Sequence, residues 1–166
     1  MTKSILLLIS LLLLSACRSV APPPSTQRME RTPTPIPASD EEAIRQLVQA
    51  ESEGVVRQDM TLLAEIWTED AVVTDAKHTS DDSDDDAVWN GIDAILDRYV
   101  VLVFPGNPQS AGPVDVEITV DGDHATARAT TQIGDEVSPG GDLWTFTRCG
   151  ERWCIETLTY NLESKP

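Results

Sequence analysis

The sequence predicts an α+β domain in which three N-terminal helices pack on an antiparallel sheet, because its apolar periodicity changes once along the chain. Apolar residues recur mainly at helical spacing from residue 39 to about residue 102. From Val114 onward, apolar and polar residues alternate, which is typical of strands with one buried face. Helices followed by a run of strands predict helices gathered on one face of an antiparallel sheet.

The first predicted helix begins at Ser39 and extends to about Arg57. Ser39 and Glu42 form a capping box, since the Ser39 hydroxyl can accept a hydrogen bond from the Glu42 amide. The acidic first turn also suits the positive end of the helix dipole. This helix is therefore expected to open the folded domain.

Shorter elements complete the first half of the domain. A second helix is capped by Asp59 or Thr61 and carries apolar residues as far as Trp67. A strand is predicted over residues 71–75. A polar loop covers residues 76–87, and the third helix extends from residue 92 to about residue 102.

The second half predicts a meander of four strands. The first two cover residues 114–121 and 124–133 and meet at an Asp-Gly turn. Residues 134–141 are expected to form a loop, and residues 143–148 and 153–160 the last hairpin. The apolar face of the first strand consists of Val114, Val116, Ile118 and Val120.

The N-terminal segment resembles the export signal of bacterial lipoproteins. Lys3 supplies a positive charge, the largely apolar run 5–14 follows, and two small residues precede Cys17. Ten residues are too few to cross a bilayer, which takes about 20 helical residues. The resemblance implies removal of residues 1–16 and lipidation of Cys17; the alternative is an ordinary signal peptide with a chance cysteine. We therefore expect an exported protein, lipid-anchored to a membrane of the bacterial cell envelope.

Amino-acid composition distinguishes a proline-rich tether from the folded domain, and the charge of that domain limits the partners it can bind. Residues 18–38 contain six prolines, which favour an extended polyproline II conformation, so residues 17–38 are expected to link the lipid to a domain at 39–166. That domain holds eight Lys and Arg against 27 Asp and Glu. A field of this sign repels phosphate backbones, so no nucleic-acid partner is expected.

Two cysteines remain once Cys17 is assigned to the lipid. Cys149 and Cys154 flank the turn of the last hairpin, in a protein expected in a compartment that permits disulfides. Facing β-carbons across a hairpin are close enough for a bridge after some twist. A Cys149–Cys154 disulfide is predicted, and two buried free thiols are the alternative.

Several stretches together resemble a known superfamily. They are the Ile44-x-x-Leu47 pair, the run from Leu62 to Val73, the run from Trp89 to Ile95, and the closing hairpin at residues 144–155. With these motifs, residues 42–162 resemble the nuclear transport factor 2-like superfamily, which includes SnoaL-like polyketide cyclases and ketosteroid isomerases. The resemblance implies a cystatin-like roll, in which three helices close a strongly curved antiparallel sheet. The resulting cone would admit a small apolar ligand at its mouth.

The resemblance also implies candidate catalytic residues. Counting from Asp70-Ala71, the general base of ketosteroid-isomerase relatives falls on Asp75, and their late-strand neutral acid falls close to Asp142. Burial beside an apolar pocket would raise the pKa of Asp75. The relatives' first-helix tyrosine falls on Glu51, which cannot donate unless protonated, so the oxyanion hole looks incomplete. The alternative for Asp75 is a carboxylate that ends a strand at an exposed loop.

Aromatic residues are the candidates for ligand contact. The resemblance places four of them on the elements that wall the cone, where rigid rings suit a ligand pocket. Packing within the core is the alternative for each ring. These candidates are Trp67, Trp89, Tyr99 and Trp144.

Metals and cofactors have weak support in the sequence. Five aspartates between residues 81 and 86 partly mimic the start of an EF-hand loop. Ala87 replaces the turn glycine and no glutamate occupies the twelfth position, so a solvated acidic loop is favoured over a calcium site. His78 and His124 lack zinc-ligand spacing, and no phosphate-loop, nucleophile or redox motif is present. We therefore expect no metal and no cofactor.

Three functions remain compatible with the sequence. The first is a membrane-anchored module that binds a small apolar or amphipathic ligand. The second is an isomerase, cyclase or dehydratase that uses Asp75 as general base. The third is a dimerisation or protein-docking module that uses the open face of the sheet, which leaves a homodimer as a further expectation.

Replacing Cys17 tests the lipid anchor. The Cys17→Ala variant should move the protein from the membrane pellet to the soluble fraction, because firm anchoring needs several acyl chains and the cysteine is their attachment point. Fractionation followed by intact-mass measurement of the wild type gives the result. A variant that stays in the pellet, or an unmodified wild-type cysteine, would contradict the prediction.

Overall fold

The computed structural model describes residues 36–109, 111–133, 136–137 and 140–162. The expected signal, Cys17 and the tether as far as residue 35 lie outside the described residues. Within the described part, no helix is both long enough and apolar enough to span a membrane.

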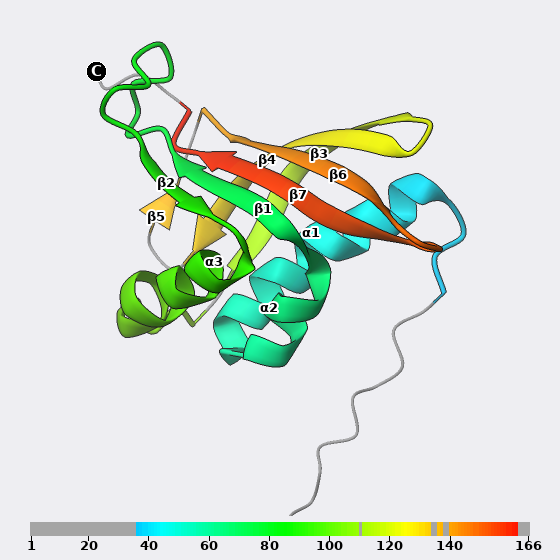
Figure 1. The fold of residues 1–166 in the computed structure, drawn as a ribbon, viewed down its shortest axis with the longest axis horizontal. Coiled ribbons are helices and arrows are strands. Elements are labelled where there is room, and N and C mark those ends of the chain that lie inside the picture. Colours follow the sequence, from blue (N-terminus) through cyan, green and yellow to red (C-terminus); the bar gives the residue numbers. More distant parts are fainter. Residues whose placement is uncertain (1–35, 110, 134–135, 138–139, 163–166) are drawn as a thin grey trace, which may run out of the picture. The chain divides into compact units, whose positions relative to one another are not determined.

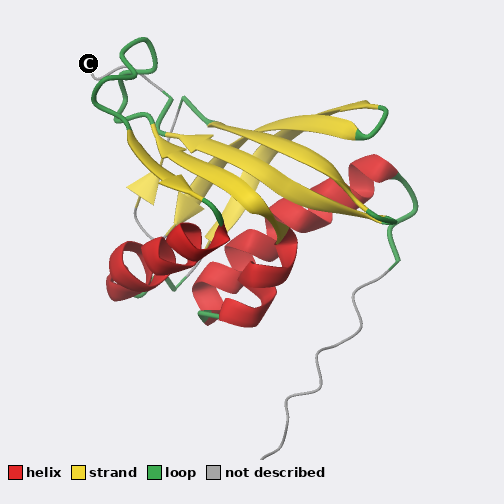
Figure 2. Cartoon of the chain, viewed as in Figure 1, coloured by secondary structure: helices red, strands yellow, loops and turns green. Residues whose placement is uncertain are grey.

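Helices lie on one side of a curved sheet, as Figures 1 and 2 show. The helical elements are α1 (Asp40–Arg57), α2 (Met60–Ile66) and α3 (Ile92–Arg98), which continues through a π-helical turn (Tyr99–Val103) and a 3-10 turn (Phe104–Gly106). The strands are β1 (Trp67–Asp75), β2 (Ala87–Asn90), β3 (Ala111–Asp121), β4 (His124–Ile133), β5 (Glu136–Val137), β6 (Asp142–Cys149) and β7 (Arg152–Tyr160). The predicted α+β class with three N-terminal helices is confirmed.

The sheet is mixed, where the sequence predicted antiparallel pairing throughout. Its strands follow the order β2-β1-β7-β6-β4-β3, with β5 paired to β4. The chain's first and last long strands, β1 and β7, are parallel neighbours, and Asp75 lies opposite Tyr160. Apolar alternation gives the buried face of a strand but not its direction or its partner, so this pairing was not predictable from periodicity.

Three local expectations are corrected. Trp67 begins β1 and does not belong to the second helix, and residues 87–90, between the expected loop and the third helix, form the edge strand β2. Val114 is 53% exposed, although alternation placed it on the buried face. A register shift between Val114 and Glu117, with Asp115 at φ 52°, is a bulge that breaks the alternation at that point.

The helix starts follow the predicted caps and are tied to the sheet. The Glu42 amide donates to the Ser39 hydroxyl, and the Leu62 amide donates to Asp59, which identifies Asp59 as the second cap. Helices α1 and α2 approach closely at Gly54, where an added Cβ would lie 2.9 Å from Leu63 Cδ2. A side chain at position 54 would therefore push α1 and α2 apart, so glycine allows the two helices to pack closely.

A ring stack and a disulfide hold the two ends of β6. Trp144 stacks between Trp67 and Phe146, with ring centroids 6.3 and 6.4 Å away. The predicted Cys149–Cys154 bridge is confirmed, with a Cα–Cα distance of 5.9 Å across the turn to β7. Closing so short a loop stabilises the fold by about 2 kcal/mol on the chain-entropy account.

Candidate functional site

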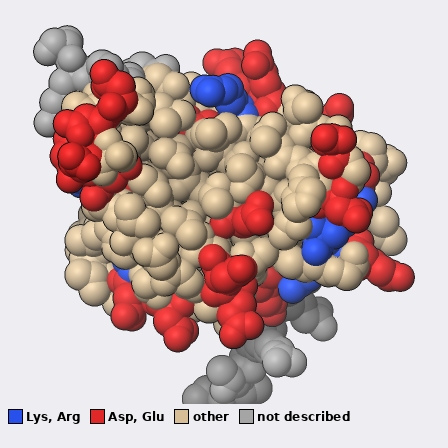
Figure 3. Space-filling view, turned by 45° about the horizontal axis from the view of Figure 1, so that its top comes forward, with Lys and Arg blue, Asp and Glu red and all other residues tan. Residues whose placement is uncertain are grey.

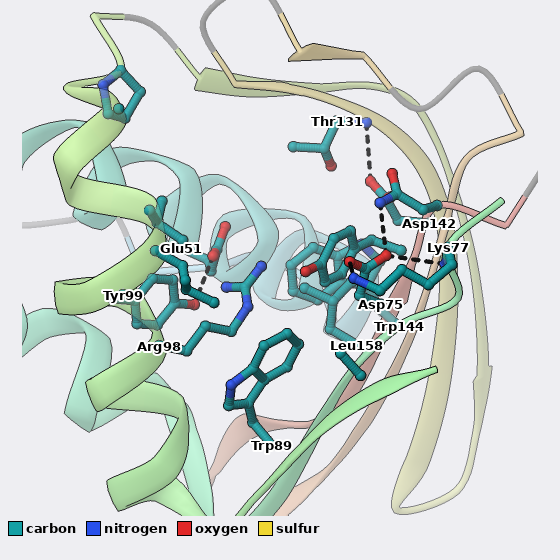
Figure 4. Close-up of a pocket in the computed structure, with 17 residues that line it drawn as sticks. Glu51, Asp75, Lys77, Trp89, Arg98, Tyr99, Thr131, Asp142, Trp144 and Leu158 are labelled. Atoms are coloured by element: carbon teal, nitrogen blue, oxygen red, sulfur yellow. Dashed lines mark hydrogen bonds and ion pairs between the residues drawn. The ribbon is translucent and has the colours of Figure 1, made fainter. Parts of the chain in front are cut away.

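A cavity of about 690 Å³ lies between the helices and the concave face of the sheet. Its volume is within the range of about 300–1,000 Å³ that small-molecule sites occupy. Helices α1 and α3 wall one side, and strands β1, β6 and β7 wall the other (Figure 4). The cavity combines aromatic and aliphatic walls with charged groups at both sides.

Asp75 is in the cavity wall, but its carboxylate is already satisfied by protein donors. Lys77 Nζ donates to Oδ2 at 2.6 Å, while the Lys77 amide and Asn161 Nδ2 donate to Oδ1 at 3.0 and 2.8 Å. Burial raises the pKa of Asp75, but these hydrogen bonds and the Lys77 charge outweigh burial and hold that pKa below its ordinary value. The expectation of a raised Asp75 pKa is therefore wrong, because the sequence did not reveal the contact with Asn161.

Asp142 also lies in the cavity wall and is only 2% exposed. Its Oδ2 accepts a hydrogen bond from the Thr131 amide at 3.0 Å. The preceding residue, Gly141, has φ +83°, and an added Cβ there would lie 2.9 Å from the Ala129 carbonyl oxygen. Glycine thus lets β6 start close against β4, which places Asp142 near Asp75 in the view of Figure 4.

Glu51 forms a buried pair with Tyr99 on the opposite side of the cavity. Glu51 is 4% exposed, and the Tyr99 hydroxyl donates to its Oε1 at 2.7 Å. Burial raises the pKa of Glu51 above its ordinary value, against the opposing effects of the Tyr99 hydrogen bond and the Arg98 charge. The hydroxyl that contacts Glu51 belongs to Tyr99, which is in the π-helical turn after α3 and not in α1.

Arg98 reaches the same side of the cavity from the end of α3. Figure 4 shows its guanidinium extending into the space between Glu51 and Trp89. The guanidinium carbon lies 5.0 Å from the ring centroid of Trp89 and 4.8 Å from that of Tyr160. These distances allow cation–π attraction, which holds the charge over aromatic faces.

Three of the four aromatic candidates line the cavity, namely Trp89, Tyr99 and Trp144. Trp67 is not part of the wall; it is 4% exposed and packs behind Trp144. A ring in that position supports the wall from the core, so contact with a ligand is not expected for Trp67.

The acidic loop shows no arrangement for a metal. Within the described ranges, no group of three or more His, Cys, Asp or Glu side chains is placed to hold an ion. Two of the aspartates instead accept hydrogen bonds from other residues of the same loop. The Thr79 hydroxyl donates to Asp85, and the Asp84 amide donates to Asp82. The face drawn in Figure 3 is acidic, with more Asp and Glu than Lys and Arg on it.

Sequence reasoning missed Arg98, Lys77, Tyr160 and Asn161 as parts of the site. A signal existed for Arg98, because it is the single Lys or Arg between Lys77 and Arg128 in an otherwise acidic stretch. No comparable signal marked Tyr160 and Asn161, since their position depends on the pairing of β7 with β1.

The fold and the site together define the class of protein. A cone of helices on a curved sheet, with a cavity between them, is the arrangement that the superfamily resemblance implied. The family model of the SnoaL-like domain matches residues 37–159, so the chain belongs to the SnoaL-like domain family. The sequence has no match among curated proteins.

Solved structures agree with this assignment at the level of the fold. An NTF2-like protein with a cystatin-like fold from Novosphingobium aromaticivorans is 22% identical, with a TM-score of 0.59 over 73% of this chain and 80% of that chain. A cystatin-like protein of unknown function from Nostoc punctiforme is 10% identical, with a TM-score of 0.60 over 80% and 96%. A "putative ketosteroid isomerase" from Parabacteroides distasonis is 15% identical, with a TM-score of 0.54 over 74% and 87%.

Replacing Glu51 tests its protonation in the folded state. The Glu51→Gln variant should gain stability relative to the wild type as pH rises above about 4.3, the ordinary pKa of glutamate. The sign follows from the raised pKa of Glu51: the folded protein binds the proton more tightly than the unfolded chain, so its stability falls as pH rises through this window. Glutamine is neutral and retains an acceptor for the Tyr99 hydroxyl.

Denaturant unfolding at several pH values measures the effect. The matched control is Glu69→Gln, which removes an exposed carboxylate from β1 and should not reproduce the pH-dependent gain. A constant difference between Glu51→Gln and the wild type at all pH values would show that Glu51 is ionised in the fold.

Proposed function

We propose that the domain binds a small amphipathic ligand in the cavity between α1, α3 and the sheet. The observation that carries this proposal is a cavity of about 690 Å³ whose wall combines aromatic and aliphatic side chains with a few charged groups. Concave, mostly apolar sites of this size with a small number of polar groups are typical of small-molecule binding.

The state of Asp75 favours binding over base catalysis. A general base needs a pKa near the working pH and a free lone pair directed at the substrate. Asp75 instead has a lowered pKa and receives three hydrogen bonds, two of them from Lys77. We therefore rank ligand binding above an isomerase or cyclase that uses Asp75.

A dehydratase-like or isomerase-like activity is the second candidate, because the cavity contains two acids of opposite character. The pKa of Glu51 is raised by burial, whereas the pKa of Asp75 is lowered by its hydrogen bonds, and such a division is typical of acid–base pairs in enzymes. The Asp75→Asn variant separates the candidates. An enzyme should lose turnover and keep binding, whereas a binding module shows no turnover of any substrate in the wild type.

The cellular setting of this proposal is a lipid anchor at Cys17 on a bacterial envelope membrane. This setting is supported by the sequence that resembles a bacterial lipoprotein signal before Cys17, and by the Pro-rich segment that follows the cysteine. A domain held at a membrane surface is well placed to take up amphipathic molecules, since these concentrate at such surfaces. A docking or homodimer function has no specific contact in its favour.

Filling the cavity tests the proposed binding function. Val103 lines the cavity from the π-helical turn, and Val103→Trp should occupy space that a ligand needs. The neutral probe 2-naphthamide should raise the Tm of the wild type by mass action. Its affinity should fall by about tenfold or more in the variant, measured by calorimetry.

The matched control is Val101→Trp in the same turn. Val101 is 66% exposed and does not line the cavity, so the same substitution there should leave the affinity for 2-naphthamide unchanged. Equal binding by wild type and Val103→Trp would place the probe elsewhere, and no binding by the wild type would count against the proposal.

A further inference from the structure

Arg98 differs from Lys77, the other cation of the cavity wall, in having no ion-paired carboxylate among the described residues, although its charge acts on Glu51 and opposes the effect of burial on the Glu51 pKa. Lys77 and Asp75 form an ion pair of 2.6 Å, so their charges compensate each other. Among the described residues, Arg98 has no carboxylate within ion-pair distance. The rings of Trp89, Tyr160 and Tyr99 surround its guanidinium at centroid distances of 4.8 to 5.7 Å.

The guanidinium also retains unused hydrogen-bonding capacity. Its Nε is buried and has no hydrogen-bond partner among the described residues. Arginine presents its donors in a planar fork that matches the two oxygens of a carboxylate. The rings of Trp89 and Tyr99 contact the guanidinium through cation–π attraction, and Tyr160 also forms a hydrogen bond with it, which leaves the other donors of the fork for a ligand.

The neighbouring acids restrict the charge of a complementary ligand. Glu51 lies on the Arg98 side of the cavity in Figure 4, and Asp75 and Asp142 lie on the opposite side. The domain around them is strongly acidic, with eight basic against 27 acidic residues from 39 onward. One negative charge can be paired by Arg98, whereas a second would meet acidic groups without a free cation, so a monoanion is favoured over a dianionic phosphate.

We propose that the cavity selects a monocarboxylate, whose carboxylate group pairs with Arg98 and whose apolar part packs against Trp144 and Leu158. This inference rests on the proposed ligand-binding function and names the chemical class of its ligand. Arg98 is then a specificity-determining residue, because it distinguishes an acid from a neutral molecule of the same shape.

The test compares two probes of nearly equal shape, 2-naphthoate and the neutral 2-naphthamide, by calorimetry at pH 8. Wild-type protein should bind 2-naphthoate about tenfold more tightly or better, which corresponds to about 1.4 kcal/mol. Arg98→Gln should abolish this preference, measured as the ratio of the two affinities in the same variant. The control Arg152→Gln removes an equal charge from an exposed position at the start of β7, and should keep the preference.

The outcomes separate this inference from the binding function. Equal affinities of the wild type for both probes, or a preference that survives in Arg98→Gln, would overturn the carboxylate assignment while ligand binding stands. Failure of both probes to bind would overturn both proposals. Arg98→Lys provides a second variant that keeps the charge over the rings; because it loses the planar fork, its preference should fall between those of the wild type and Arg98→Gln.

Discussion

The parallel pairing of β1 with β7 is the constraint on which the rest of the site depends. It joins the first and last long strands of the chain and places Asp75 opposite Tyr160. The pairing continues past the strand ends, where the Ala76 amide donates to the Tyr160 carbonyl at 3.0 Å and the His78 amide to that of Asn161 at 2.9 Å. Asn161 thereby reaches Asp75, and Tyr160 reaches Arg98. One backbone register thus connects both sides of the cavity.

The charges of the cavity are arranged so that each side has a different electrostatic character. Desolvation raises the pKa of both carboxyl groups, but at Asp75 the combined hydrogen bonds and the Lys77 charge outweigh it, so that the pKa of Glu51 is raised and that of Asp75 is lowered. Arg98 adds a positive charge held by rings rather than by an acid. This arrangement suits recognition of a ligand with one charged end, and it leaves Asp75 a weak base although the resemblance pointed to it as the catalytic carboxylate.

Membership of the SnoaL-like family explains the shape of the cavity but not its chemistry. The solved structures that resemble this chain share its cystatin-like roll at 10 to 22% identity, a level that carries the fold alone. The function has to come from the groups on the cavity wall. Here those groups are the Glu51–Tyr99 pair, the Asp75–Lys77 pair and Arg98, and they are the basis of the proposed binding of an amphipathic acid.

Local patterns determined which segments fold and how their ends are fixed. Caps at Ser39 and Asp59, the α+β class and the Cys149–Cys154 bridge depend on residues close in sequence, and each is confirmed. The family resemblance led to Asp75, Asp142 and three of the rings that line the cavity. Tertiary structure alone decided the partner of β1, the bulge near Asp115 that exposes Val114, and the contacts of Asp75 and Arg98. The reason is physical: apolar periodicity records which side of an element is buried, whereas a pKa or an ion pair depends on groups that meet only when distant strands pair.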